Sequence, residues 1–126
     1  MEWLNRLNDA LDYLEANLTG EIDLEHTARL AACSQFHFQR MFTYIAGVPL
    51  GEYLRRRRMT LAALMLTSGE AKVIDLALLF GYDSPTAFNR AFQSVHGVPP
   101  SRAREAGVRL TAYPRISFTL SVKGET

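Results

Sequence analysis

Apolar side chains recur at the spacing of a single helix face in three segments of this chain, residues 35–46, 50–68 and 85–96. The side chains that this pattern buries are Phe38, Met41, Phe42 and Ile45 in the first segment, Leu54, Leu61, Leu64 and Met65 in the second, and Phe88, Phe92 and Val95 in the third. Because polar residues occupy the opposite side of each stripe, the pattern predicts three amphipathic helices.

Residues that favour helix ends lie at both limits of these segments. Two shorter helices are predicted, one before segment 35–46 and one before segment 85–96. The predicted N-caps are Asp23, Ser34 and Ser84, the glycines that end the longer helices are Gly47 and Gly97, and the shorter helices cover about 24–31 and 73–80. A short helix, a tight turn and a second helix form the helix-turn-helix pattern. The pattern occurs twice in this chain.

The two helix-turn-helix units are copies of one another. A shift of 50 positions superimposes seven identical residues, namely Ser34 on Ser84, Phe38 on Phe88, Arg40 on Arg90, Phe42 on Phe92, and Gly47-Val48-Pro49 on Gly97-Val98-Pro99. Upstream the shift becomes 49, so that Ala28 meets Ala77 and Ala32 meets Gly81. The change places one extra residue near Asp83, in the second turn. So many identities in matching roles indicate an internal duplication.

The side of each longer helix opposite its apolar stripe carries groups that suit the major groove of DNA. These faces present Phe36, Gln39, Arg40 and Thr43 in the first unit and Thr86, Asn89, Arg90 and Gln93 in the second. Arg can donate two hydrogen bonds to guanine, Gln or Asn can pair with adenine, and Thr or a Phe edge can pack on the thymine methyl group. An exposed Phe36 also indicates a contact surface.

Segment 50–68 predicts a connecting helix about 28 Å long, at 1.5 Å per residue. Adjacent major-groove faces on one side of B-DNA are about 34 Å apart, so this connector holds two reading helices near adjacent groove segments, and DNA bending would close the gap. Its four arginines, residues 55–58, point around the whole helix. We expect one or two of them to contact phosphates and the others to pair with Glu52 or the acidic N-terminal helix.

Further along the chain, residues 99–104 predict a short helix that begins with two prolines. Its serine and arginines, Ser101, Arg102 and Arg104, are typical of a phosphate clamp at a helix N-terminus.

Charge is distributed unevenly along the chain. Residues 1–33 contain seven acidic and two basic side chains, whereas residues 34–126 contain six acidic and twelve basic ones. A basic body of this kind can attract phosphates, although solvated basic surfaces also occur in proteins that bind nothing acidic. The length of 126 residues fits one domain. The sequence offers neither an apolar run of about 20 residues that could span a membrane nor a secretory signal peptide.

The chemistry of an enzyme is not indicated. Cys33 lies in a turn without a neighbouring His–Asp pair, and the three histidines lack metal-ligand spacing. We interpret Cys33 as a small buried residue in a reducing compartment, and we predict no metal and no cofactor. Two other readings remain, a helical bundle without a ligand and a helical protein-interaction module centred on Phe36. DNA binding weakens steeply with salt, whereas an apolar protein interface does not.

At these residues the sequence resembles the AraC/XylS family of bacterial transcription regulators, over about residues 5–106. The resemblance is carried by Ser34-x3-Phe38-x-Arg40-x-Phe42, Gly47-x-Pro49-x3-Tyr53, Leu54-x3-Arg58-Met59, Asp75-x-Ala77-x3-Gly81-Tyr82, Ser84-x3-Phe88-x-Arg90-x-Phe92 and Gly97-x-Pro99. It implies an all-α domain over 1–107, with seven helices and with helix-turn-helix subdomains at about 22–47 and 73–97.

The family resemblance also implies how the protein works. The third and sixth helices would enter adjacent major grooves of double-stranded DNA, as a monomer. The protein would regulate transcription in the bacterial cytoplasm, at the nucleoid, as an activator that contacts RNA polymerase.

Matched position by position, the resemblance assigns base reading to three residues of each unit, and the first set is the more discriminating. These residues are Phe36, Gln39 and Arg40, and Thr86, Asn89 and Arg90. Phosphate or secondary contacts are assigned to Gln35, Thr43, Arg55, Pro85, Gln93, Ser101 and Arg102. The sequence departs from the family at Phe36, where members often have Trp or Tyr, and at Pro85, where they often have Gln.

The end of the sequence, residues 115–123, alternates apolar and polar side chains and predicts a half-buried strand. A helical domain gives such a strand no partner, so it pairs with a second copy or belongs to a sheet beyond this sequence. We favour the second interpretation, in which residues 108–126 are a linker and the first strand of a further C-terminal domain. The resemblance implies a GyrI-like effector-binding domain there, through which a small-molecule inducer would act.

Overall fold

The structure is a computed structural model that describes residues 2–69 and 71–119. In these residues it contains six α-helices, one 3-10 helix and no β-strand. The elements are α1 (Glu2–Ala16), α2 (Leu24–Leu30), α3 (Gln35–Ala46), α4 (Leu50–Ser68), α5 (Val73–Leu79), α6 (Pro85–His96) and the 3-10 helix η1 (Pro100–Arg102). The all-α fold class is confirmed.

The expected count of seven α-helices was wrong. Residues 99–104 form only the short 3-10 helix η1, because just Pro100 and Ala103 of this segment are buried. A segment with so little packing lacks the tertiary support that sustains further helical turns.

The predicted caps are present at the starts of α2, α3 and α6. The side chains of Asp23, Ser34 and Ser84 each accept a hydrogen bond from the backbone N–H three residues later, at 3.0–3.1 Å. The longer helices end at Gly47 and Gly97, which adopt the left-handed conformation with φ of 80° and 77°. Local cap chemistry therefore fixes the ends of both helix-turn-helix units.

The two turns inside these units have the same geometry, as the duplication predicts. Ala32 and Gly81 occupy equivalent positions, and both are left-handed, with φ of 59° and 79°. In each turn the next residue donates its N–H to a buried alanine carbonyl, from Cys33 to Ala28 at 3.0 Å and from Tyr82 to Ala77 at 2.9 Å. The extra residue in the second turn therefore falls after Tyr82, where the sequence comparison placed it.

The helices enclose two separate cores, one for each unit. The first core contains Leu7, Ala10, Leu11, Leu14, Leu18, Ala28, Phe38, Phe42, Leu50, Tyr53 and Leu54. The second core contains Met59, Ala62, Ala63, Leu66, Leu76, Ala77, Phe80, Phe88, Ala91, Phe92 and Ala103. Because α4 supplies residues to both lists, it is the element that joins the units.

The single apolar stripe predicted for α4 was partly wrong. Leu54 is buried and Leu61 is half-buried, but Leu64 and Met65 are exposed. At 3.6 residues per turn, the α4 residues of the first core and those of the second core lie on opposite sides of the helix. A helix that is buried on two sides has no single apolar face for the pattern to reveal.

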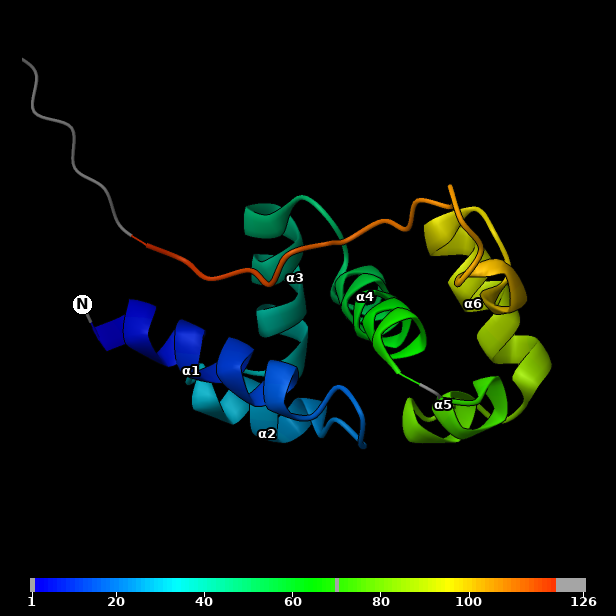
Figure 1. Cartoon of the computed structure of the whole chain (residues 1–126). Coiled ribbons are helices and arrows are strands. Elements are labelled where there is room, and N and C mark those ends of the chain that lie inside the picture. The colour runs from blue at the N-terminus through cyan, green and yellow to red at the C-terminus, as the bar shows by residue number, and fades with distance from the viewer. Residues whose placement is uncertain (1, 70, 120–126) are drawn as a thin grey trace, which may run out of the picture.

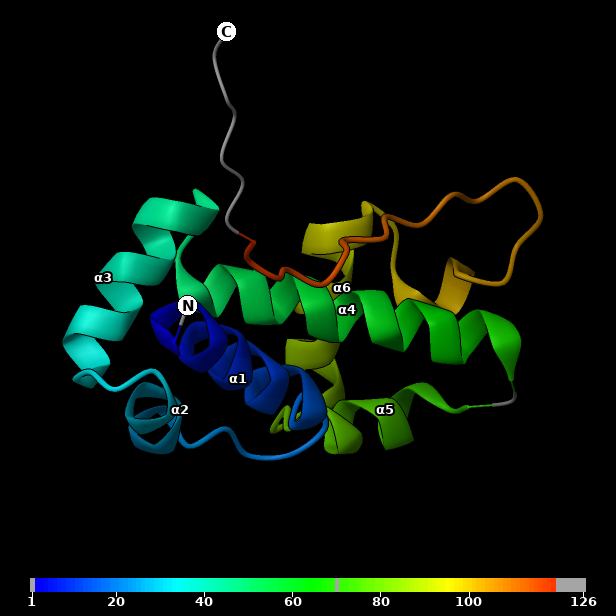
Figure 2. The same ribbon diagram turned by 90° about the vertical axis from the view of Figure 1, so that its left-hand side faces the viewer.

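The prediction that Ile45 is buried on α3 was also wrong. Phe38 and Phe42 are buried, whereas Ile45 is 44% exposed. Ile45 lies in the last turn of α3, which projects beyond α1 and α2 (Figure 2). The corresponding prediction for α6 holds better, because Phe88 and Phe92 are buried and Val95 packs half-buried on the second core.

Helices α3 and α6 run in broadly the same direction in two views at right angles, and α4 crosses between them (Figures 1 and 2). The chain after η1 returns across α4 to lie beside α1, far from α6 (Figure 1). The part of the predicted strand that the structure describes, residues 115–119, is extended but forms no strand, since its backbone pairs with side chains of the helical domain. The rest of the predicted strand lies outside the described residues.

Candidate nucleic-acid interface

The face of α3 that points away from the first core exposes the predicted residues of the first unit. Phe36, Gln39, Arg40 and Thr43 are all exposed, and Phe36 is 71% exposed. Together with Tyr44 they line a surface hollow of about 530 Å³. The helix contains no acidic residue, so nothing on it repels a phosphate backbone.

Two details give this face a defined shape. The Arg40 guanidinium lies over the Phe36 ring, with its central carbon 5.5 Å from the ring centroid. This cation–π contact leaves the guanidinium N–H groups free at the edge of the stack. The Thr43 hydroxyl donates to the Gln39 carbonyl at 2.9 Å, so that its methyl group and its lone pairs are what it offers to a ligand.

Sequence reasoning missed Tyr44, which is 90% exposed next to these residues. Tyr44 lies one position beyond the i, i+3, i+4, i+7 set that defined the face. An unexplained large aromatic residue outside the apolar stripe was the signal that could have found it.

The equivalent face of α6 exposes Thr86, Asn89, Arg90 and Gln93, as predicted. Pro85 is exposed at the first turn, at the position that corresponds to Gln35 in α3. This helix also lacks acidic residues. This face of α6 carries no aromatic residue, so it offers less apolar contact area than the face of α3. It depends on Asn89 and Arg90 for directional hydrogen bonds.

The four arginines of α4 are mostly engaged within the protein. Arg55 and Arg56 both bind Glu52, and Arg55 also donates to the Ser94 hydroxyl on α6. Arg57 is buried and forms an ion pair with Glu15 of α1, which raises the pKa of the guanidinium. The expected pairing with Glu52 and with the acidic N-terminal helix is therefore confirmed.

The side chain of Arg58, the last of the four, is also turned inward. Its Nε donates to the Leu18 carbonyl at 3.0 Å, and burial lowers its pKa. Arg55, assigned to a phosphate, is the most exposed of the three arginines of α4 that form ion pairs. Its pair with Glu52 and its hydrogen bond to Ser94 hold it beside α6.

The predicted phosphate clamp at 99–104 is divided by the fold. Ser101 and Arg102 are exposed, and Arg102 pairs with Glu105 at 3.1 Å. Arg104 instead donates to the carbonyls of Leu66, Gly69 and Ala71, at 2.5–2.9 Å, and so satisfies the end of α4. Arg104 is therefore a structural residue rather than part of a clamp.

The described part of the chain gives no support to two other types of site, a metal centre and a reactive thiol. No group of three His, Cys, Asp or Glu side chains there is placed to hold a metal ion. Burial raises the pKa of the Cys33 thiol, which makes it a poor nucleophile at neutral pH. Among the described residues, no helix combines the length and the apolar character that crossing a membrane requires.

Known proteins are similar to this chain in sequence and in fold. A family model described as a helix-turn-helix domain matches residues 27–106. The HTH-type transcriptional activator AarP of Providencia stuartii is 39% identical over 98 residues, which cover 78% of this chain and 73% of that protein. The multiple antibiotic resistance protein MarA of Escherichia coli is 34% identical over 98 residues, which cover 78% of this chain and 77% of that protein.

Solved structures agree with these relatives. The DNA-binding domain of the global transcriptional factor AdpA, determined in complex with a target DNA, has a TM-score of 0.72 at 26% identity, over 80% of this chain and 91% of that one. The family match, the relatives and the fold all lead to one assignment. The chain belongs to the AraC-type helix-turn-helix family of transcription regulators.

Proposed function

We propose that this protein binds an operator in double-stranded DNA as a monomer and regulates transcription from it. Helices α3 and α6 enter adjacent major grooves. The observation that carries this proposal is the repetition of one exposed, acid-free helix face on two helices that point in the same general direction (Figures 1 and 2). A single chain that repeats its reading face in this way needs no second subunit to contact two half-sites.

The base-reading residues are the two matching sets on these faces. They are Phe36, Gln39 and Arg40 on α3, and Thr86, Asn89 and Arg90 on α6, with Tyr44 as an added contact. Gln35, Thr43, Arg55, Pro85, Gln93, Ser101 and Arg102 make phosphate or secondary contacts. The α3 set discriminates more strongly, because the stack of Arg40 on Phe36 orients the guanidinium before DNA arrives.

Transcription is activated through contact with RNA polymerase. The name of the relative AarP, a transcriptional activator, supports this sign of regulation. Transcription in vitro from a template with the selected operator measures it, and added protein is expected to raise transcript yield. A fall in yield would make the protein a repressor.

Selection of binding sites from a random DNA pool tests the proposal as a whole. Folded protein is expected to enrich one sequence made of two half-sites about one helical turn apart. A pool that shows no enrichment in the presence of folded protein would overturn the proposal.

The Arg40→Ala variant tests the α3 assignment. We expect it to weaken binding to the selected operator by about 1–3 kcal/mol and to relax the preference at one base pair, because a bidentate guanine contact is lost. Fluorescence anisotropy against a set of single-base operator variants measures both effects. Arg6→Ala, which removes an exposed arginine from α1, is the matched control and keeps the base preference. A uniform loss over all DNA sequences would assign Arg40 to a phosphate instead.

The exposed aromatic residues Phe36 and Tyr44 also favour a second candidate, a protein-interaction surface on α3. Salt separates the two functions. Binding through several phosphate contacts weakens by orders of magnitude as salt rises, and binding through an apolar interface does not. An affinity for the selected operator that is constant between about 0.05 and 0.2 M salt would favour the protein partner.

A further inference from the structure

The segment that returns from η1 to α1, residues 110–118, touches both helix-turn-helix units and is named the brace here. We propose that the brace fixes the placement of the two units relative to each other, and that it thereby sets the half-site spacing that the protein accepts. The role of the brace in half-site spacing rests on the proposed function. The role of the brace in placing the two units concerns the protein alone and can be measured without DNA.

The brace begins at the second unit. The Thr111 N–H donates to Nδ1 of His96, the last residue of α6, at 3.0 Å. The other ring nitrogen, Nε2, bonds the Met59 carbonyl of α4 at 2.8 Å. Leu110 packs on the second core beside them. This end of the brace is therefore tied to the end of a reading helix.

The middle of the brace is held by α4. The Tyr113 N–H donates to the Thr60 hydroxyl at 3.0 Å, and the Tyr113 carbonyl accepts from Arg57 at 2.5 Å. The Tyr113 ring lies under the Arg56 guanidinium, 4.7 Å from its central carbon. Both backbone polar groups of Tyr113 and its side chain are thus fixed to the connecting helix.

The far end of the brace belongs to the first unit. The Ile116 N–H donates to the Tyr53 hydroxyl at 3.0 Å. Asn8 of α1 bonds Phe118 twice, accepting its N–H at 2.9 Å and donating to its carbonyl at 2.8 Å. Ile116 and Phe118 pack on the first core, and Arg115 pairs with Asp12. Consecutive residues of one short segment therefore reach from α6 to α1.

Few other contacts connect the units. In the described chain, the helix pairs that pack extensively either lie within one unit or involve α4. A hollow of about 390 Å³ separates the loop at residues 20–22 of the first unit from Phe80 and Gly81 of the second. Apart from α4, the brace is thus the principal tie between the two reading helices.

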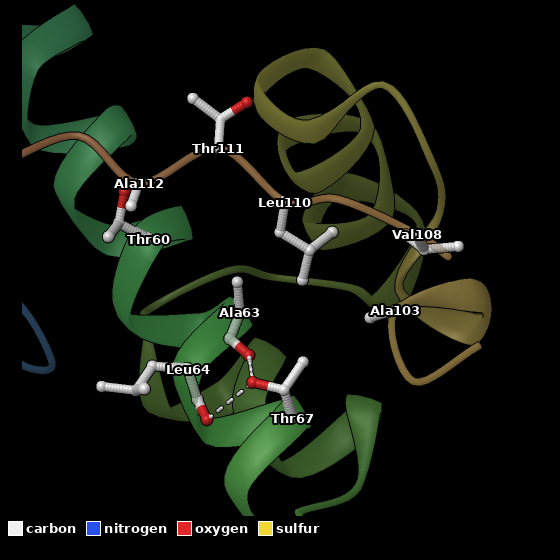
Figure 3. A pocket seen from close by; sticks show the side chains of 9 residues that line it. All are labelled: Thr60, Ala63, Leu64, Thr67, Ala103, Val108, Leu110, Thr111 and Ala112. Atoms are coloured by element: carbon white, nitrogen blue, oxygen red, sulfur yellow. Dashed lines mark hydrogen bonds between the residues drawn. The ribbon is translucent and has the colours of Figure 1, made fainter. Parts of the chain in front are cut away.

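The brace packs on the two cores through Leu110, Ile116 and Phe118, but it does not fill the space beside α4. A cavity of about 400 Å³ remains between α4 and residues 108–112, with Leu110 directed into it and the Thr111 side chain directed away (Figure 3). Because several of the attachments are hydrogen bonds, among them those to Asn8, Thr60 and His96, some of them can be removed without emptying either core. A brace-release variant should therefore keep both units folded.

The test compares Asn8→Ala/Thr60→Val, which removes three of these hydrogen bonds, with Ser117→Ala, an exposed position of the same segment. Spin labels on Thr43→Cys and Gln93→Cys, in a Cys33→Ser background, report the distance between the reading helices without DNA. We expect a single narrow distance distribution in the control and a broader or shifted one in the release variant. Equal distributions would overturn the proposal.

The same unlabelled variants are then measured on operators whose half-sites are moved apart or together by one base pair. Each step displaces a half-site by about 3.4 Å and rotates it by about 35°. We expect the preference for the best spacing to fall by about three- to thirtyfold in the release variant, and to stay unchanged in the control. A folded release variant with the unchanged spacing profile would overturn the proposed role in spacing.

Circular dichroism at the temperature of the assay establishes that both variants are folded. Should the double variant fail to fold, Asn8→Ala and Thr60→Val are measured singly, with the same two readouts. If the protein selects no DNA sequence at all, the proposed function fails, and the spin-label distances still decide whether the brace holds the units.

Discussion

At the scale of single residues, Ala32 is the one described non-glycine residue with a positive φ, 59°. Its counterpart in the second unit, Gly81, adopts φ of 79° without this cost, because glycine has no Cβ to meet the following carbonyl. The left-handed conformation costs an L-residue about 1–2 kcal/mol of conformational free energy. The first turn therefore keeps its shape through the packing and hydrogen bonds around it.

Ala32→Gly should raise the free energy of unfolding by about 0.5–1 kcal/mol, since relief of the left-handed conformation outweighs the greater freedom of glycine in the unfolded chain. Urea unfolding measures the change. Gly81→Ala is the reciprocal control and should lower the free energy of unfolding by a similar amount, because its φ of 79° strains any L-residue. A Cβ there would meet no atom within 4 Å, so no clash adds to this cost. A destabilised Ala32→Gly protein would contradict the account.

His96 is a buried titratable residue that links α6, α4 and residue Thr111. Burial lowers its pKa from 6.5, and the hydrogen bond to the Met59 carbonyl opposes this only in part. The neutral ring can donate from Nε2 and accept from Thr111 at Nδ1, whereas a protonated ring has no acceptor. Folding therefore favours the neutral form.

This linkage predicts a loss of stability on acidification. His96 binds more protons in the unfolded chain than in the folded one, so its contribution is present above pH 6.5 and is lost as pH falls toward its lower folded pKa. Urea midpoints measured from about pH 7.5 to about pH 5 should fall more in the wild-type protein than in His96→Gln. Parallel pH profiles for the two proteins would refute the assignment.

At the scale of elements, helix ends were predictable and helix faces only partly so. Ser34, Ser84, Gly47 and Gly97 act within one turn of themselves, so the sequence contains the whole cause of each helix end. The exposure of Leu64 and Ile45 depends on which other helix lies nearby, and no local pattern contains that information. The described part of the strand predicted at residues 115–123, residues 115–119, is not a strand for the same reason, because its pairing partners are side chains of α1 and α4.

Arg104 gives an element-scale prediction at the end of α4. The Arg104→Ala variant should lose about 1–3 kcal/mol of stability, because three carbonyl groups at and after the last turn of α4 lose their charged donor. Thermal or urea unfolding measures this. Arg102→Ala, two residues away and paired only at the surface, should change stability by less than about 0.5 kcal/mol. Equal effects of the two substitutions would disprove the capping role.

At the scale of the whole molecule, the two cores share one helix and one brace. The candidate site is likewise divided between the two units, with one face on α3 and one on α6. Which residues share a face of α3 or α6 could be predicted from helical period alone, and every residue predicted for those faces is exposed. How the two faces are oriented could not be predicted, because it depends on α4 and on residues 110–118, whose contacts join positions up to 110 residues apart.

The shared helix predicts that the units unfold together. Phe92→Ala removes a fully buried ring from the second core and should cost about 3–5 kcal/mol. Trp3, the one tryptophan, lies on α1 in the first unit, so its fluorescence reports that unit, while circular dichroism reports all helices. We expect the two signals to change at one lowered urea midpoint. A fluorescence midpoint that stays at the wild-type value would show two independent units.

The position of α4 between two cores also has a consequence for slow motion. A partial opening that releases α1–α3 leaves the other side of α4 covered by α5 and α6, and the reverse opening leaves the first side covered. The backbone amides in the middle turns of α4 reach solvent only when both openings occur at once. Those turns are therefore the part of the protein that exchanges its amide hydrogens most slowly, at the rate set by complete unfolding.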